Sequence, residues 1–88
     1  MTEQKITIMN RAGIHMRPAA VIVDTAKDYK STIHLEKDSY KINAKSILGI
    51  MTLGAGYGNE INIIAQGEDE KEAVAALARL FESRFEEE

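Results

Sequence analysis

The chain has 88 residues, a formal net charge of −3 and no cysteine, which fits one small domain spanning 1–88 and excludes disulfides and thiolate metal sites. The charge is uneven, because residues 1–59 carry eight Lys and Arg against five Asp and Glu, whereas residues 60–88 carry three against nine. No apolar run is long enough to cross a bilayer, and the N-terminus lacks the apolar stretch of a signal peptide, so we expect a cytoplasmic protein without membrane insertion.

The first part of the chain predicts a strand followed by an amphipathic helix. Residues 5–9 alternate well enough for a strand, and residues 10–13 read as the loop that follows it. Apolar residues at helical spacing predict a helix from Met16 to about Lys27 with one buried face. Pro18 fits the first turn of this helix, where a backbone N–H would have no acceptor within the helix.

A hairpin is predicted next. Residues 32–36 and 40–43 alternate between apolar and polar side chains, and residues 37–39 between them are turn formers. His34 alternates with the inward-facing apolar residues of the first strand. We therefore interpret it as a solvent-facing strand residue without a chemical role.

A short helix and a glycine-rich connection follow the hairpin. Ser46 precedes an apolar group over 47–51 and is predicted to be the N-cap of a helix of about two turns. The connection over 53–59 is not a Walker loop, because the Lys-Ser/Thr ending and the preceding strand are missing. We interpret its glycines as turn residues rather than as a phosphate cradle.

The last part of the chain predicts a strand over 60–65 and a final helix. Asp69 and Glu72 resemble a capping pair at the start of this helix. The glutamates over 86–88 lie at its unfavourable, partly negative end and predict a solvated tail. The apolar stripe of the helix consists of Ala73, Leu77, Leu80 and Phe81.

The predicted elements occur in the order βαββαβα. This order predicts an α+β fold, in which three helices cover one face of a four-stranded antiparallel sheet. The pattern alone does not distinguish this arrangement from a ferredoxin-like one of similar length, although a ferredoxin-like domain would not require the short helix after Ser46.

His15 is the best candidate for chemistry, because it lies at the start of the first predicted helix. The first amides of a helix and its dipole favour a phosphate or carboxylate at that end, and the imidazole supplies a nucleophile there. A phosphoryl group on His15 would be met by the amides of Met16 and Arg17 and by the Arg17 guanidinium. The residues therefore predict phosphohistidine chemistry, with an ordinary helix-start histidine as the alternative.

Other classes of function have weaker support in the sequence. Two widely separated histidines offer no metal-ligand spacing, so we expect no metal and no cofactor. The basic residues are scattered and do not interleave with the five aromatic residues, which argues against a nucleic-acid partner. A stand-alone enzyme is the remaining alternative, but a chain of this size offers no sizeable pocket, and no second catalytic group accompanies His15.

Two motifs carry a resemblance to a known family. The stretch Gly13-Ile14-His15-Met16-Arg17-Pro18-Ala19 is followed about thirty residues later by Lys45-Ser46-Ile47-Leu48-Gly49-Ile50-Met51-Thr52-Leu53-Gly54. Together they resemble the HPr family, the histidine-containing phosphocarriers of the bacterial phosphoenolpyruvate:sugar phosphotransferase system. The similarity extends over essentially all 88 residues, and it implies the HPr-like open-faced sandwich rather than the ferredoxin-like arrangement.

The resemblance also implies a mechanism. Enzyme I, phosphorylated from phosphoenolpyruvate, would pass its phosphoryl group to Nδ1 of His15, and Arg17 would stabilise the phosphate. The resulting pros-phosphohistidine would then donate the group to enzyme IIA domains of sugar permeases. The chain would act as a monomeric carrier and not as a stand-alone catalyst.

A docking surface for these partners is implied as well. Position 16 is usually a small residue in this family, so Met16 is a departure that is expected to shift partner preference while its backbone N–H is retained. The docking residues carried over from the resemblance are Met16, Ile47, Leu48, Met51, Thr52 and Gly54.

The resemblance assigns a second role to Ser46, because many members of the family are phosphorylated at the matching serine as a regulatory mark. The implied partners are an HPr kinase/phosphorylase and a catabolite control transcription regulator. Two alternatives follow, a mainly regulatory paralogue and a phosphocarrier of the nitrogen branch. The presence of His15 argues against a purely regulatory role, since purely regulatory relatives lack the histidine.

Overall fold

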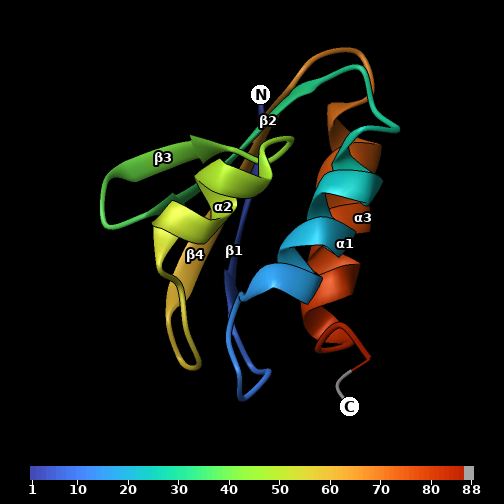
Figure 1. The fold of residues 1–88 in the computed structure, drawn as a ribbon. Coiled ribbons are helices and arrows are strands. Elements are labelled where there is room, and N and C mark those ends of the chain that lie inside the picture. Colours follow the sequence, from blue (N-terminus) through green and yellow to red (C-terminus); the bar gives the residue numbers. More distant parts are fainter. Residues whose placement is uncertain (87–88) are drawn as a thin grey trace.

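A four-stranded antiparallel sheet with three helices makes up the computed structural model, which describes residues 1–86 (Figure 1). The strand order in the sheet is β1-β4-β2-β3. The predicted α+β fold and element order are confirmed. In chain order the elements are β1 (Thr2–Thr7), α1 (Met16–Ala26), β2 (Thr32–Lys37), β3 (Tyr40–Asn43), α2 (Ile47–Leu53), β4 (Glu60–Gln66) and α3 (Glu70–Glu82).

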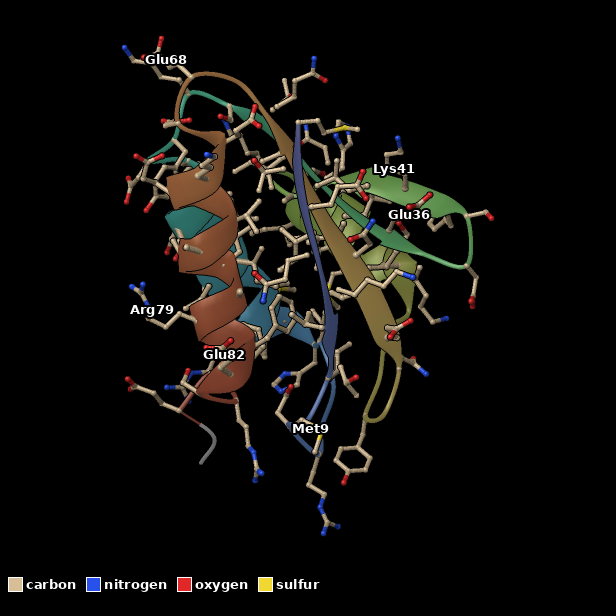
Figure 2. All side chains as sticks on the ribbon, turned by 180° about the vertical axis from the view of Figure 1, so that it is seen from behind. Met9, Glu36, Lys41, Glu68, Arg79 and Glu82 are labelled. Carbon is tan, nitrogen blue, oxygen red and sulfur yellow. The ribbon has the colours of Figure 1, made fainter. Side chains whose placement is uncertain are left out.

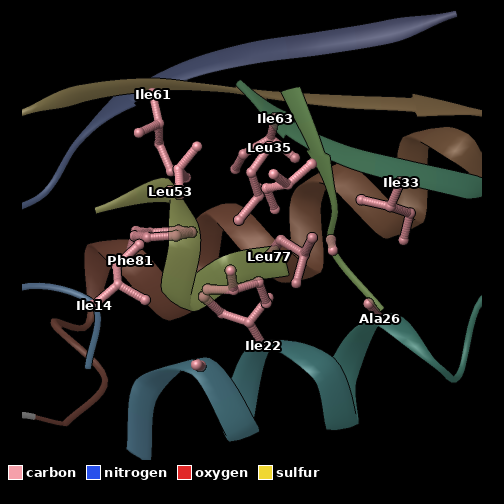
Figure 3. Close-up of a cluster of buried hydrophobic side chains, with 14 of the residues drawn as sticks. Ile14, Ile22, Ala26, Ile33, Leu35, Leu53, Ile61, Ile63, Leu77 and Phe81 are labelled. Carbon is pink, nitrogen blue, oxygen red and sulfur yellow. The ribbon is translucent and has the colours of Figure 1, made fainter. Parts of the chain in front are cut away.

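The core lies between the sheet and the helices. Alternation along β4 turns Ile61 and Ile63 toward the helices, and the register places Leu35 of β2 opposite Ile63. Ile22 of α1 and Leu77 of α3 approach these residues from the helical layer (Figure 3). Burial of this apolar surface is the main favourable contribution to the stability of so small a domain.

The other face of the sheet is covered by none of the three helices described and is mostly polar. Glu36 of β2 and Lys41 of β3 form a directly opposed pair on it (Figure 2). His34 also lies on this open face but is half-buried, because Ile64 of β4 is paired directly opposite it. Ile64 itself is only 8% exposed, so the centre of the open face is less polar than the sequence pattern suggests.

β1 begins earlier than predicted and also ends earlier, at Thr7 rather than Met9. The register pairs Thr2 with Ala65 of β4, so the polar N-terminal residues form the ladder. Strand alternation is weak here because β1 is an edge strand with mostly exposed side chains. The predicted tail over 86–88 lies, beyond residue 86, outside the described residues.

Asp69 is the N-cap residue of α3, as predicted, but the capping role predicted for its side chain is wrong. Its side chain makes no capping hydrogen bond to α3. Its carboxylate accepts instead from the backbone N–H of Lys30 at 2.8 Å, and from the backbone N–H and hydroxyl of Ser31 at 2.9 and 2.5 Å. Asp69 therefore ties the chain entering β2 to the start of α3, a long-range contact that local patterns do not show.

Glu70 holds the N-terminus of the chain in a similar way. Its carboxylate accepts from the Thr2 hydroxyl at 2.7 Å and from the Gly67 N–H at 3.1 Å, and it lies 3.0 Å from the Met1 ammonium group. These contacts lower the pKa of Glu70 to about 2, with the Thr2 hydroxyl as the largest cause. The Ser31 hydroxyl, followed by the Lys30 N–H, lowers the pKa of Asp69 in the same way.

Because both pKa values are lower in the folded chain, these carboxylates stabilise it when they are charged. That stabilisation is present above the ordinary pKa values of 3.8 and 4.5 and is lost as the pH falls through the folded values. We therefore expect the melting temperature to fall as the pH is lowered from 4.5 to about 2. Asp69→Asn is expected to melt lower than the wild type at pH 7 and to depend less on pH in the acid range.

The melting temperatures are measured by circular dichroism, with Glu68→Gln as the matched control. Glu68 pairs with Lys30 at 3.4 Å, but both side chains are largely exposed, so its removal should change the melting temperature little. A melting temperature for Asp69→Asn at pH 7 equal to that of Glu68→Gln would contradict the role given to Asp69.

Candidate functional site

His15 is the N-cap residue of α1, and its side chain is exposed. Its backbone is extended, with φ −102° and ψ −164°, and its carbonyl accepts the Ala19 N–H at 3.0 Å. The imidazole makes no capping hydrogen bond. It therefore lies at the positive end of the helix dipole without serving the helix as a cap, and a partner can reach it.

A tight loop sets the position of His15. Asn10 closes this loop, because its carbonyl accepts the Gly13 N–H at 3.0 Å and its side-chain amide donates to the Gly13 carbonyl at 2.6 Å. The next residue, Ile14, donates its N–H to the Ala55 carbonyl at 3.1 Å. The loop that leads into α1 is thus bound to the connection between α2 and β4.

Gly13 makes the close approach of these two segments possible. Its φ is +73°, a conformation that favours glycine, and a Cβ atom placed there would lie 2.8 Å from Cα of Gly56. A side chain at position 13 would therefore require both a strained backbone and a separation of the two segments.

α1 positions the predicted phosphate-stabilising residues through its amphipathic pattern. Pro18, Ala19 and the later apolar residues of the stripe are buried, which leaves Met16 and Arg17 exposed beside His15. Met16 is 60% exposed. The amides of Met16 and Arg17 belong to the first turn, the part of a helix that binds anions. The structure thus places His15, Met16 and Arg17 together at the start of α1.

Ser46 is the N-cap of α2, as predicted. Its hydroxyl accepts the Gly49 N–H at 3.0 Å, and the residue is half-buried. The apolar residues after it are exposed, most of all Leu48 at 79%. Ile47 and Met51 are exposed to a smaller extent. α2 therefore presents an apolar surface next to a serine hydroxyl.

The two remaining docking residues contact other parts of the chain. The Thr52 hydroxyl donates to the Gly49 carbonyl at 2.7 Å and lies 3.3 Å from the Tyr40 hydroxyl. Gly54 ends α2 with φ +65°. The residue after it, Ala55, provides the carbonyl that binds Ile14, so Gly54 lies close to the loop before His15.

The end of α3 contributes residues near His15 that the sequence analysis missed. The start of α1 and the end of α3 lie at the same end of the molecule (Figure 1). Together with residues 10–12 they line a groove of about 490 Å³, whose walls include His15, Arg17 and Arg84. The expectation that a chain of this size offers no sizeable pocket is therefore wrong. No local signal marks Arg84, because its approach to His15 depends on the antiparallel packing of α3 against α1.

Two kinds of feature are absent from the described part of the chain. Within residues 1–86, no three His, Cys, Asp or Glu side chains are grouped so that they could hold a metal ion. None of the helices in the same residues has the length and apolar character needed to span a membrane.

Comparison with known proteins decides the family. The family model described as "PTS HPr component phosphorylation site" matches residues 2–83. The chain belongs to the HPr family. Phosphocarrier protein HPr of Treponema pallidum is 46% identical over 88 residues, which cover all of both chains. The HPr-like protein Crh of Bacillus subtilis is 47% identical over 78 residues, covering 89% of this chain and 92% of Crh.

Solved structures of HPr proteins show the same fold. HPr-C-His from Thermoanaerobacter tengcongensis superposes with a TM-score of 0.96 at 52% identity, covering all of this chain and 99% of the other. HPr from Bacillus anthracis gives a TM-score of 0.87 at 39% identity, covering 91% and 95% of the two chains. The open-faced sandwich implied by the resemblance is therefore confirmed.

The substitution Gly13→Ala tests whether the close approach of Gly13 to Gly56 stabilises this HPr-family chain. We expect the free energy of unfolding to fall by about 2–4 kcal/mol, because the backbone strain at positive φ adds to the contact with Gly56. Urea unfolding followed by circular dichroism measures this change.

Gly58→Ala is the matched control. Gly58 has φ +84°, but no atom lies within 4 Å of a Cβ placed there. Gly58→Ala should therefore lower the free energy of unfolding only through backbone strain, by about 1–2 kcal/mol. Equal losses in the two variants would show that the approach of Gly13 to Gly56 does not matter.

Proposed function

We propose that this chain is a phosphocarrier whose His15 accepts a phosphoryl group from phosphorylated Enzyme I and passes it to enzyme IIA domains. The observation that carries this proposal is the exposed His15 imidazole at the start of α1, which the helix does not use as a cap. We propose that the carrier is a monomer, because His15, Met16 and Arg17 all lie at the start of one helix. We place the carrier in the cytoplasm, where Enzyme I would donate the phosphoryl group.

The proposed transfer is an in-line displacement at phosphorus. The lone pair on Nδ1 of neutral His15 forms the new N–P bond, while the bond from phosphorus to the donor atom of Enzyme I breaks and its electron pair stays with the donor. No proton has to be removed, so no general base is required. The transition state spreads negative charge over three phosphoryl oxygens, and stabilising that charge is the main task of the site.

The residues at the start of α1 are suited to this task. The first-turn amides of Met16 and Arg17 and the Arg17 guanidinium would face the phosphoryl oxygens. The site lies at the surface, so the phosphoryl group would be held without being buried. This matters for a carrier, because a ground state bound too tightly would slow the second transfer to enzyme IIA. The chain thus acts as a carrier rather than as a stand-alone catalyst.

Exposed apolar side chains provide a surface on which successive partners can dock. Met16, Leu48 and Met51 lie on α1 and α2, two helices that pack against each other. Methionine side chains adapt to partners of different shape. We propose that this surface, flanked by Ile47, Thr52 and Gly54, contacts both Enzyme I and enzyme IIA, with Met16 shifting the preference among partners.

Labelling with Enzyme I and radioactive phosphoenolpyruvate tests the carrier role. We expect acid-labile label on the wild-type chain and none on His15→Ala. Arg17→Ala should still be labelled, but about ten- to a hundredfold more slowly, because one source of charge stabilisation is lost. Arg79→Ala serves as a control, since Arg79 projects from the outer side of α3 (Figure 2). Full labelling of His15→Ala would overturn the proposal.

Regulation at Ser46 is a second candidate function. The 47% identity to Crh favours it, since a structure of that protein is described as "Catabolite Repression HPr". A phosphate at the start of α2 would be tolerated by the helix dipole, yet it would place about two negative charges beside exposed Leu48. We propose an HPr kinase/phosphorylase as the modifying enzyme and a catabolite control transcription regulator as the reader. A role in the nitrogen branch would use the same His15 chemistry.

Incubation with ATP and an HPr kinase/phosphorylase tests this second role. We expect acid-stable label on the wild type and on His15→Ala, but not on Ser46→Ala. Ser46→Ala should also lose about 1 kcal/mol of stability, because the Gly49 N–H loses its acceptor. A chain that is labelled by the kinase but not by Enzyme I would be a mainly regulatory paralogue. Acid-stable label on Ser46→Ala would exclude Ser46 as the modified residue.

A further inference from the structure

We propose that the groove between the start of α1 and the end of α3 binds a small aromatic anion, with a phosphate or carboxylate group at one end and a flat ring at the other. The groove measures about 490 Å³, within the range of roughly 300–1,000 Å³ that is usual for small-molecule sites. This inference rests on the walls of the groove in the unphosphorylated chain and does not depend on the carrier role proposed for His15.

The charges around the groove favour an anion. Among residues 1–86, the groove is lined by Arg11, Arg17, Arg84 and His15 and by one acidic side chain, that of Glu86. Arg84 has no ion-pair partner among residues 1–86. Arg11 is oriented by Tyr57, whose ring centre lies 5.7 Å from the guanidinium carbon. Guanidinium groups bind phosphate and carboxylate through paired hydrogen bonds.

The remaining walls favour an aromatic ring. Pro18 and Val21 of α1 face the groove from one side, and Leu80 and Phe85 face it from the other. The Phe85 ring packs edge-on against Phe81, with the ring centres 4.9 Å apart, so it is anchored to the core. Free phosphate would leave these apolar walls unused, whereas an aromatic acid would cover them.

The turn after α3 holds Arg84 and Phe85 at the groove in an unusual conformation. Arg84, Phe85 and Glu86 have φ of 56°, 55° and 49°, although none of them is glycine. Residues other than glycine rarely adopt this conformation, and backbone strain of this kind is concentrated at functional sites. The Phe85 N–H donates to the Leu80 carbonyl at 2.9 Å and closes the turn.

Asn10 adds a polar group at the edge of the groove. It is only 4% exposed, and its carbonyl oxygen Oδ1 has no hydrogen-bond donor in the described structure. Its Nδ2 atom is used, because it donates to the Gly13 carbonyl. A buried acceptor without a donor is costly. Because this oxygen is closed to solvent, a donor group on the ligand would reach it only through a buried water molecule.

Titration of the whole 15N-labelled chain with phenyl phosphate, followed by NMR, tests the proposal without any partner protein. We expect shifts of the amides over residues 10–12 and 84–86, and binding at least tenfold tighter than that of inorganic phosphate. Benzoate, tested in parallel, shows whether carboxylate or phosphate is preferred. Because Enzyme I is absent, a failure here is distinct from a failure of the carrier role.

Arg84→Ala and Phe85→Ala are the test variants, and each should weaken phenyl phosphate binding about tenfold. Arg79→Ala removes an arginine of α3 that lies outside the groove, so this variant should bind like the wild type. If Phe85→Ala perturbs the fold, Arg84→Ala at the exposed turn still decides the question. The proposal is overturned if phenyl phosphate binds no better than inorganic phosphate, if Arg84→Ala binds unchanged, or if the shifts are confined to Leu48 and its neighbours on α2.

Discussion

The contact between the loop before α1 and the chain after α2 is the constraint on which the site depends. The Ile14 N–H binds the Ala55 carbonyl, and Gly13 lies against Gly56 where no side chain would fit. This contact fixes the first turn of α1, and with it the place of the imidazole, the guanidinium and the first amides. The buried stripe of α1 then holds the rest of the helix on the core. The candidate nucleophile is therefore positioned by packing and by a close approach that only glycine allows at position 13. A capping bond from the His15 side chain plays no part in it.

Much of the fold and the centre of the site could be predicted from local signals. Pro18 and the helical spacing after Met16 predict the start of α1 correctly. Ser46 is correctly predicted as the N-cap of α2, because a serine before an apolar run is a strong local signal. The predictions fail for residues whose contacts join parts of the chain that are far apart in the sequence. Asp69 looks like a cap by its position, but its carboxylate is satisfied by Lys30 and Ser31, whose nearness comes from the fold. Arg84 could not be associated with His15, since only the packing of α3 beside α1 brings them to one groove.

The two halves of the chain divide the charge in a way that suits the proposed chemistry. The start of α3 holds its acidic residues against the N-terminus of the chain and the entry to β2, where Asp69 and Glu70 have specific donors. The arginines at the other end of the fold line the groove beside His15. Asp69 and Glu70 thus serve the structure at one end of α3, and three arginines lie near its other end together with Glu86. Separation of this kind attracts anionic groups to the imidazole without a highly charged chain.

The open face of the sheet has a practical value for studying the protein. The opposed pair of Glu36 and Lys41 lies on this face, which no helix covers (Figure 2). The chain contains no cysteine, so a cysteine placed at position 41 would be its sole thiol. A fluorophore or a surface tether attached there would report on partner encounters while leaving the imidazole and the exposed side of α2 accessible.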